Sequence, residues 1–142
     1  MSDAIIYLDT SAYIAILLEG KKGHALWDFI QGKKIISSVL LILEAERNIL
    51  RLSRERKISP EQYSESIAQI KADIEVFKLK NLNLELCLTN VFPPVQTPRS
   101  SDLAHLRTAL WFMQNERLDF FITLDEAQRR SAVDCGLPVK IF

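Results

Sequence analysis

The feature that most constrains the fold is a short apolar run, Ile5-Ile6-Tyr7-Leu8, that ends directly in Asp9. Two hydroxyl residues, Thr10 and Ser11, follow it, and an apolar pattern at helical spacing then begins. A short apolar run that a turn ends is typical of a buried strand in a parallel sheet. Open α/β sheets bind ligands at the carboxyl ends of their strands. Asp9 is therefore expected either to bind a cation there or to cap the helix beginning near Ser11.

The rest of the chain alternates predicted strands with predicted helices. We expect strands over residues 4–8, 34–38, 82–88, 120–124 and 137–142, and helices over 9–18, 24–31, 39–56, 100–116 and 126–134. Ser59-Pro60-Glu61-Gln62 has the capping pattern that begins a further helix, so two long helices should form a hairpin across residues 39–80. The three prolines between residues 89 and 99 predict a loop, and Gly32 and Gly136 should end helices. The pattern predicts an α/β fold with a mainly parallel sheet.

Length and composition favour a single domain over residues 1–142 and exclude few functions. A formal net charge of zero gives no global signal for nucleic acid or membrane binding, although a local basic strip remains compatible with it. The longest apolar-rich run, residues 35–43, is too short to span a bilayer, and the N-terminus lacks the pattern of a signal peptide. Cys87 and Cys135 form no C-x-x-C motif, and we expect buried, reduced thiols in a cytoplasmic protein.

Three further acidic residues are predicted to join Asp9 at the same edge of the sheet. Glu44 lies one turn into the helix after the second strand, and Asp125 ends the apolar run Phe120–Leu124. Asp102 falls on the apolar face of the helix over residues 100–116, where an unpaired carboxylate is costly. Its other interpretation is a first-turn aspartate that the helix dipole stabilises.

Four converging carboxylates with no lysine or arginine at the same positions would repel one another, and a divalent cation would remove that repulsion. Mg²⁺ and Mn²⁺ prefer oxygen ligands, and carboxylate-bound metals promote phosphoester hydrolysis. The chain has no Gly-rich phosphate loop, no G-x-S-x-G motif and no Cys/His zinc spacing. These residues therefore favour metal-assisted hydrolysis of a phosphodiester.

Side chains beside these acids have two interpretations each. Arg47, Arg51 and Arg54 form a strip next to Glu44, which would guide a phosphate backbone or is only the solvated face of the helix. His105 is expected to be a structural hydrogen-bonding residue rather than a base. Trp111 is expected to face away from the core, at an interface or as a lone exposed aromatic.

The chain resembles the PIN-domain ribonucleases, and among them the VapC-type toxins of toxin–antitoxin pairs. The resemblance covers essentially the whole chain and depends on four segments in order, namely Tyr7-Leu8-Asp9-Thr10-Ser11-Ala12, Glu44, Ser101-Asp102-Leu103-Ala104-His105-Leu106, and Ile122-Thr123-Leu124-Asp125 followed by Ala132, Gly136-Leu137 and Val139. Many members carry a further aspartate where this chain has Ala127 and Gln128, which leaves the number of metal ions open.

The resemblance implies a three-layer α/β/α sandwich and an endoribonuclease that depends on Mg²⁺ or Mn²⁺. It implies that Asp9, Glu44, Asp102 and Asp125 bind the metal and that Ser11 and Thr123 support the site. It further implies that the protein is a homodimer and that a cognate antitoxin protein binds it. Two alternatives are a PIN-like nuclease that acts in RNA processing and a non-catalytic α/β binding module.

Overall fold

Four parallel strands form the centre of the protein. A computed structural model describes residues 3–18, 21–88, 93–96 and 99–142. Within these ranges the strands form one sheet in the order β3-β2-β1-β4. Their bounds are Ile5–Leu8 for β1, Lys34–Ser38 for β2, Lys78–Lys80 for β3 and Phe120–Ile122 for β4. The predicted α/β class with a parallel sheet is therefore confirmed.

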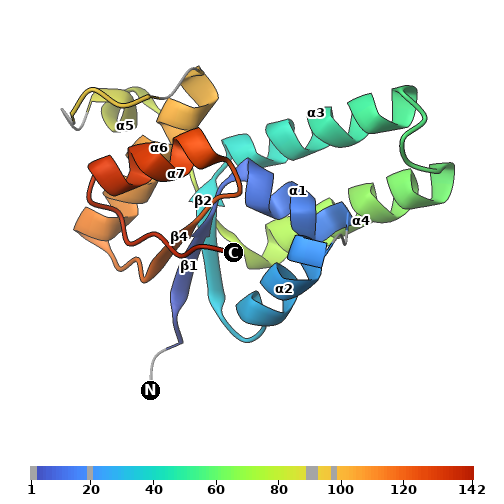
Figure 1. Cartoon of the computed structure of the whole chain (residues 1–142), viewed down its shortest axis with the longest axis horizontal. Coiled ribbons are helices and arrows are strands. Elements are labelled where there is room, and N and C mark those ends of the chain that lie inside the picture. Colours follow the sequence, from blue (N-terminus) through green and yellow to red (C-terminus); the bar gives the residue numbers. More distant parts are fainter. Residues whose placement is uncertain (1–2, 19–20, 89–92, 97–98) are drawn as a thin grey trace.

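Helices cover both faces of this sheet (Figure 1). The helices α1 to α4 pack together on one face, and α6 and α7 lie on the other with α5 beside α6. This arrangement is consistent with a three-layer α/β/α sandwich. In the described ranges, no helix combines the length and the apolar composition needed to cross a membrane. The helices are α1 (Thr10–Leu18), α2 (Lys21–Ile30), α3 (Leu40–Arg54), α4 (Pro60–Val76), α5 (Leu84–Leu88), α6 (Ser100–Asn115) and α7 (Glu126–Asp134).

The alternation of side chains along each strand divides the core into two clusters. Ile6 and Leu8 of β1 point into the cluster formed with α1 to α4, whereas Tyr7 between them points to α6 and α7. The neighbouring strands repeat this division: Ile35 and Ile122 join the first cluster, and Ile36 and Phe121 join the second. Both faces of the sheet are covered, and β1 and β4 are accordingly apolar at successive positions, which is typical of a parallel sheet.

Local signals explain where the helices begin and end. The Gln62 backbone N–H donates to the Ser59 hydroxyl over 3.1 Å, and the Ser59 N–H donates to the Gln62 side chain over 2.8 Å. This capping box begins α4, so the predicted hairpin forms between α3 and α4, which pack against each other. Gly32 and Gly136 have φ angles of 72° and 80° just after α2 and α7. Glycine adopts such angles at no steric cost, as predicted for helix ends.

Two predicted strands are wrong in whole or in part. The alternating leucines of residues 82–88 form the short helix α5 with a buried Leu86 and an exposed Leu84 and Leu88, and the third strand lies earlier, over Lys78–Lys80. The closing strand over residues 137–142 shrinks to a single parallel bridge between Val139 and Phe121. Pro138 has no N–H to donate to a sheet, which limits pairing there.

Three smaller expectations concern the two cysteines, Trp111 and the loop over residues 89–99. Cys87 is exposed and Cys135 is half-buried, so the prediction of two buried thiols is wrong. Trp111 is also half-buried, because its ring packs on Phe112 and lies beneath the Lys80 ammonium at 4.2 Å; it is no lone exposed aromatic. The predicted loop at 89–99 lies partly outside the described residues; its residues 93–96 are in no helix or strand.

Gly23 provides a test of how closely α1 and α2 pack. A methyl group at this position would lie 2.1 Å from the backbone oxygen of Ala15 in α1. Helix propensity alone would make Gly23→Ala stabilising by up to about 1 kcal/mol. We expect the opposite, a loss of about 1–3 kcal/mol in the free energy of unfolding, because the two backbones must separate. Urea unfolding measures this, with Ala25→Ser on the exposed side of α2 as the control; a Gly23→Ala protein as stable as the wild type would contradict the close packing.

Candidate functional site

One pocket at the carboxyl edge of the sheet contains all four predicted acids. It has a volume of about 510 Å³ and lies between α1, α3, α6 and α7, whose N-terminal ends meet at the upper end of the sheet in Figure 1. We call it the acidic pocket. The side chains that line it are those of Asp9, Thr10, Ser11, Ile14, Glu44, Arg47, Asn48, Arg51, Arg99, Asp102, His105 and Asp125. The structure thus brings together residues that are up to 116 positions apart in the chain, from Asp9 to Asp125.

Asp9 is the most buried of the four acids, with 4% of its surface exposed. Its Oδ1 atom accepts a hydrogen bond from the Ser11 hydroxyl at 2.7 Å and from the Ala12 backbone N–H at 3.2 Å, so it caps α1 as one interpretation predicted. Burial raises the pKa of this carboxyl above its usual value, although the charge of His105 and the hydroxyls of Thr123 and Ser11 oppose that shift. Asp9 is therefore a carboxyl group whose charged form is disfavoured by burial.

Ser11 and Thr123 lie beside Asp9, where they were predicted to support the site. Their hydroxyl oxygens are 3.1 Å apart. Ser11 also accepts a hydrogen bond from the Leu124 N–H at 2.9 Å, and Thr123 accepts one from the Asp125 N–H at 3.1 Å. The two hydroxyls therefore connect the start of α1 with the turn that follows β4, and they fix the distance between Asp9 and Asp125.

Glu44 is held by two donors on one oxygen. The Thr10 hydroxyl donates to its Oε1 atom over 2.7 Å, and His105 Nε2 lies 2.8 Å from the same oxygen. Burial by itself would raise the pKa of Glu44, but the hydrogen bonds from His105 and Thr10 outweigh it and hold the pKa below its usual value. Glu44 is thus kept ionised, with Oε1 fixed against α1 and α6.

His105 connects the acidic pocket to the core. It is 2% exposed, and its Nδ1 atom lies 2.7 Å from the hydroxyl of Tyr7, which is fully buried in β1. Its Nε2 atom contacts Glu44 and also lies 3.1 Å from the Thr10 hydroxyl. Both ring nitrogens therefore have partners, as expected for a structural hydrogen-bonding residue.

Asp102 and Asp125 share one cation, Arg99, which was not predicted from the sequence. The Arg99 Nε atom lies 3.4 Å from Oδ2 of Asp102, and its terminal nitrogen lies 4.0 Å from Oδ2 of Asp125. The expectation that no basic residue joins the four acids is therefore wrong. Asp102 is largely shielded, with 14% of its side chain exposed, and Asp125 also caps α7 by accepting from the Gln128 N–H at 3.0 Å.

The predicted basic strip only partly reaches the pocket. Among the described residues, Arg47 and Arg51 line the acidic pocket, whereas Arg54 lies beyond them toward the end of α3. The Arg51 guanidinium donates to the side chain of Asn48 over 3.0 Å, and Asn48 donates to the Glu44 carbonyl over 2.8 Å. Arg47 and Arg51 therefore extend the pocket along α3 with positive charge.

The donor set of the pocket fits a hard divalent cation. Four carboxylates and two hydroxyls supply the oxygen ligands that Mg²⁺ and Mn²⁺ prefer, and the raised pKa of Asp9 indicates a need for positive charge. No group of three or more histidine, cysteine, aspartate and glutamate side chains in the described parts of the chain is arranged so that it could hold a metal ion. Mg²⁺ keeps several waters and is commonly bound by one or two carboxylates, so it does not require such a group.

Thr10 and Arg99 contribute to the site although neither was predicted to, and His105 joins it in the structural role that was expected. Thr10 had a usable signal, because it follows Asp9 on the first turn of α1 and so faces the same edge. Arg99 had a weaker one, its i,i+3 spacing to Asp102, which becomes informative only once α6 is known to begin at Ser100.

No known protein-family model matches this chain, and no curated protein matches it significantly. The geometry and charge of the acidic pocket are therefore the features that bear on function.

The raised pKa of Asp9 predicts that removing its charge stabilises the protein, whereas most substitutions destabilise the protein that carries them. Folding raises this pKa, so the folded protein binds the proton more tightly and its stability falls as the pH rises past the ordinary aspartate value of about 4. Asp9→Asn keeps the acceptor for Ser11 and Ala12 but removes the charge. In EDTA, we expect the variant to have the higher melting temperature at pH 7 and the difference to shrink toward pH 4. Ser11→Ala is the control, because it keeps the charge; a less stable Asp9→Asn at every pH would contradict this account.

Proposed function

We propose that this protein is a metal-dependent endoribonuclease, and that it acts in the cytoplasm as the toxin of a toxin–antitoxin pair. The observation that carries the proposal is the convergence of Asp9, Glu44, Asp102 and Asp125 on one pocket at the carboxyl edge of a parallel sheet. Its arrangement agrees with the site that the resemblance to PIN-domain ribonucleases implies. An RNA-processing nuclease would use the same pocket, whereas a non-catalytic module would need no cluster of carboxylates.

In this proposal the four acids would bind Mg²⁺ or Mn²⁺, either directly or through the waters that such an ion keeps. Bound there, such an ion lowers the pKa of water and stabilises the charge that develops on a phosphate during hydrolysis. His105 and Thr10 orient Glu44 by fixing its Oε1 atom, and Glu44 would hold the ion from this position. Ser11 and Thr123 hold Asp9 and Asp125 at a constant spacing.

Arg47 and Arg51 are proposed to bind the RNA backbone beside the acids. Affinity for nucleic acid comes largely from the neutralisation of phosphates, and in a chain with no net charge this requires a local group of cations. The two arginines line the same pocket as Glu44, so a phosphate bound to them would lie next to the metal site. Arg54 would extend this path along α3 as a more distant contact.

The proposal predicts that the acids act as one unit in RNA cleavage. Asp9→Asn and Asp102→Asn should each lower the cleavage rate by at least about 100-fold, because removing an electrostatic group from a reacting centre commonly costs this much. EDTA should stop cleavage, and Mg²⁺ or Mn²⁺ should restore it better than Zn²⁺. The measurement is gel analysis of a labelled single-stranded RNA, with Asp134→Asn, an exposed acid in the last turn of α7, as the control. An Asp9→Asn protein that retains full activity in Mg²⁺ would refute the site.

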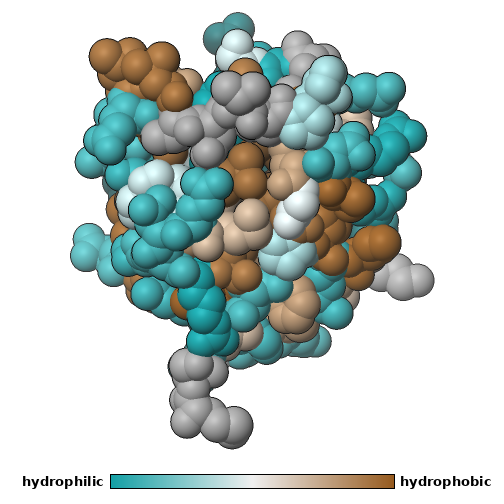
Figure 2. All heavy atoms as spheres, turned by 90° about the vertical axis from the view of Figure 1, so that its left-hand side faces the viewer, coloured by the Kyte–Doolittle hydropathy of each residue, from teal (hydrophilic) through white to brown (hydrophobic). Residues whose placement is uncertain are grey.

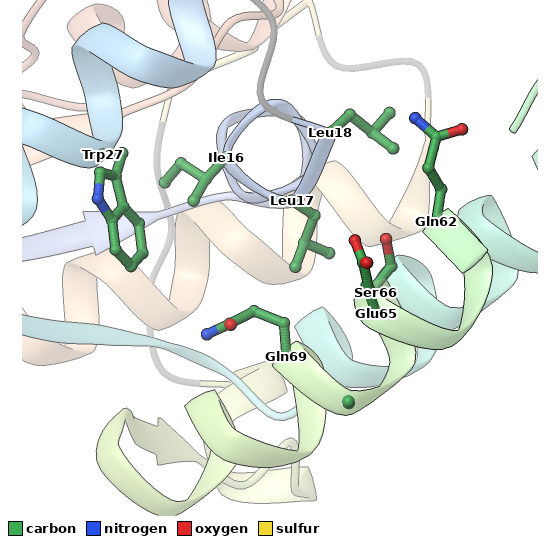
Figure 3. A pocket seen from close by; sticks show the side chains of 9 residues that line it. Ile16, Leu17, Leu18, Trp27, Gln62, Glu65, Ser66 and Gln69 are labelled. Atoms are coloured by element: carbon green, nitrogen blue, oxygen red, sulfur yellow. The ribbon is translucent and has the colours of Figure 1, made fainter. Parts of the chain in front are cut away.

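The partners in this proposal are a second copy of the chain and an antitoxin protein. A groove of about 530 Å³ lies between α1, α2 and α4, and we propose it as the binding site of an antitoxin peptide (Figure 3). Leu17, Leu18 and Trp27 form its apolar side, and Glu65 and Gln69 form part of its polar side. Apolar residues are also exposed on the side of the molecule that carries α6 (Figure 2). In α5, Leu84 and Leu88 are 75% and 73% exposed. Exposure of large apolar side chains favours a surface that a partner protein covers.

Light scattering tests both partners. We expect the chain alone to have about twice its mass of 16.3 kDa, and the chain co-expressed with the product of the neighbouring gene to form a larger complex. Glu65→Arg should weaken that complex and leave RNA cleavage unchanged, because Glu65 lines the groove and not the acidic pocket. Lys71→Gln, an exposed change elsewhere on α4, is the control. A monomer at all accessible concentrations would refute the dimer, and an unaffected complex in Glu65→Arg would exclude the groove.

A further inference from the structure

Among the lysines and arginines that the structure describes, Arg99 is the one that forms ion pairs with acids of the pocket. It lies directly before α6, and its side chain reaches Asp102 on the same helix and Asp125 at the start of α7. The guanidinium lies 3.4 Å from one carboxylate and 4.0 Å from the other, and 65% of the side chain is exposed. Arg99 therefore neutralises two of the four acids from the solvent side of the pocket.

The other arginines of the pocket have different partners. Arg51 donates to Asn48, and both Arg51 and Arg47 belong to α3 on the Glu44 side of the pocket. Asp102 and Asp125 thus have a counter-ion from within the chain. A divalent cation that binds these carboxylates must compete with the Arg99 guanidinium for the same oxygens.

The Arg99 ion pairs are of the kind that a metal ion can displace. An exposed ion pair in water contributes little to stability, because solvent screens it and the long side chain loses freedom. A guanidinium also binds phosphate in the same forked geometry with which it binds a carboxylate. Once released from Asp102 and Asp125, it would lie at the rim of the pocket with its donors free for a phosphate.

We propose that Arg99 is an exchangeable counter-ion: it occupies Asp102 and Asp125 until a divalent cation displaces it, and it then binds a phosphate of the RNA. This inference rests on the proposed function, because it concerns the same metal site. Metal binding and RNA binding then depend on each other, because the ion that occupies the site also releases Arg99 to bind a phosphate. Such coupling must be reciprocal, so RNA should in turn tighten the binding of the metal.

The proposal requires two effects of opposite sign from one substitution. Arg99→Gln removes the competitor, so Mn²⁺ should bind without RNA about fivefold more tightly, the factor that corresponds to one exposed ion pair. The same variant should bind RNA more weakly in the presence of the ion. Its plot of log K against log salt should flatten by about 0.7, the value for one lost phosphate contact on a single strand. A residue that only supports the fold would not tighten metal binding.

The experiment measures the two affinities separately. Calorimetry with Mn²⁺ alone gives the metal affinity, and fluorescence anisotropy of a labelled single-stranded RNA at several salt concentrations gives the RNA affinity in Ca²⁺, another oxygen-binding cation. Arg51→Gln is the matched control, which should weaken RNA binding without tightening Mn²⁺ binding. Arg129→Gln is a second control, because Arg129 pairs with Glu126 at 2.6 Å and does not line the acidic pocket. Neither affinity should change in that variant.

The outcomes separate this inference from the proposed function. Tighter Mn²⁺ binding and a flatter salt slope in Arg99→Gln support it. If Asp9→Asn abolishes Mn²⁺ binding but Arg99→Gln leaves it unchanged or weaker, the exchange is overturned and the metal site stands. If Asp9→Asn binds Mn²⁺ as tightly as the wild type, the pocket is not the metal site and both proposals fail. Tighter Mn²⁺ binding with unchanged RNA affinity overturns the phosphate role of Arg99.

Discussion

The hydrogen bonds of His105 are the interaction on which the rest of the site depends. Glu44 is ionised, and a carboxylate can only accept, so the Nε2 atom of His105 carries the proton that points to it. The other ring nitrogen, Nδ1, lies 2.7 Å from the Tyr7 hydroxyl, which can donate or accept there. One buried side chain in α6 thereby connects the central strand with α3. Leaving any of these buried groups without its partner would cost more than the bond itself contributes.

This connection explains how a site built from distant segments keeps its shape. Tyr7 stacks on Phe121 of the neighbouring strand at a ring distance of 5.3 Å, so the hydroxyl that orients His105 is itself fixed by the core. Asp9 and Thr10 follow Tyr7 by two and three residues and enter the pocket from the end of the same strand. The order of the sheet, with β1 between β2 and β4, places the helices that follow all three strands beside one another. The topology of the sheet therefore brings Asp9, Glu44 and Asp125 to the same carboxyl edge, and α6 adds Asp102.

The sequence alone was enough to predict most strands and the helical hairpin, because each of these elements has a strong local signal. The apolar strands β1, β2 and β4 and the capped helix α4 are set by periodicity and by residues at the ends of elements. The strand β3 has the sequence Lys-Leu-Lys and depends on pairing with β2, so no local pattern could predict it. The same holds for Arg99, which lies near the prolines of an irregular segment and acquires its partners only when α6 and α7 pack together. Residues at the ends of regular elements were predictable, whereas those positioned only by tertiary packing were not.

The structural and the functional interpretations of Asp9 and Asp125 do not exclude each other. Each aspartate uses its Oδ1 atom to accept an N–H from the first turn of a helix, which satisfies a donor that would otherwise lack a partner. A carboxylate has a second oxygen, and capping fixes the direction in which that oxygen points. A helix cap at the end of a parallel strand is therefore a means of holding a carboxylate ligand ready, and the acidic pocket has two of them on adjacent strands.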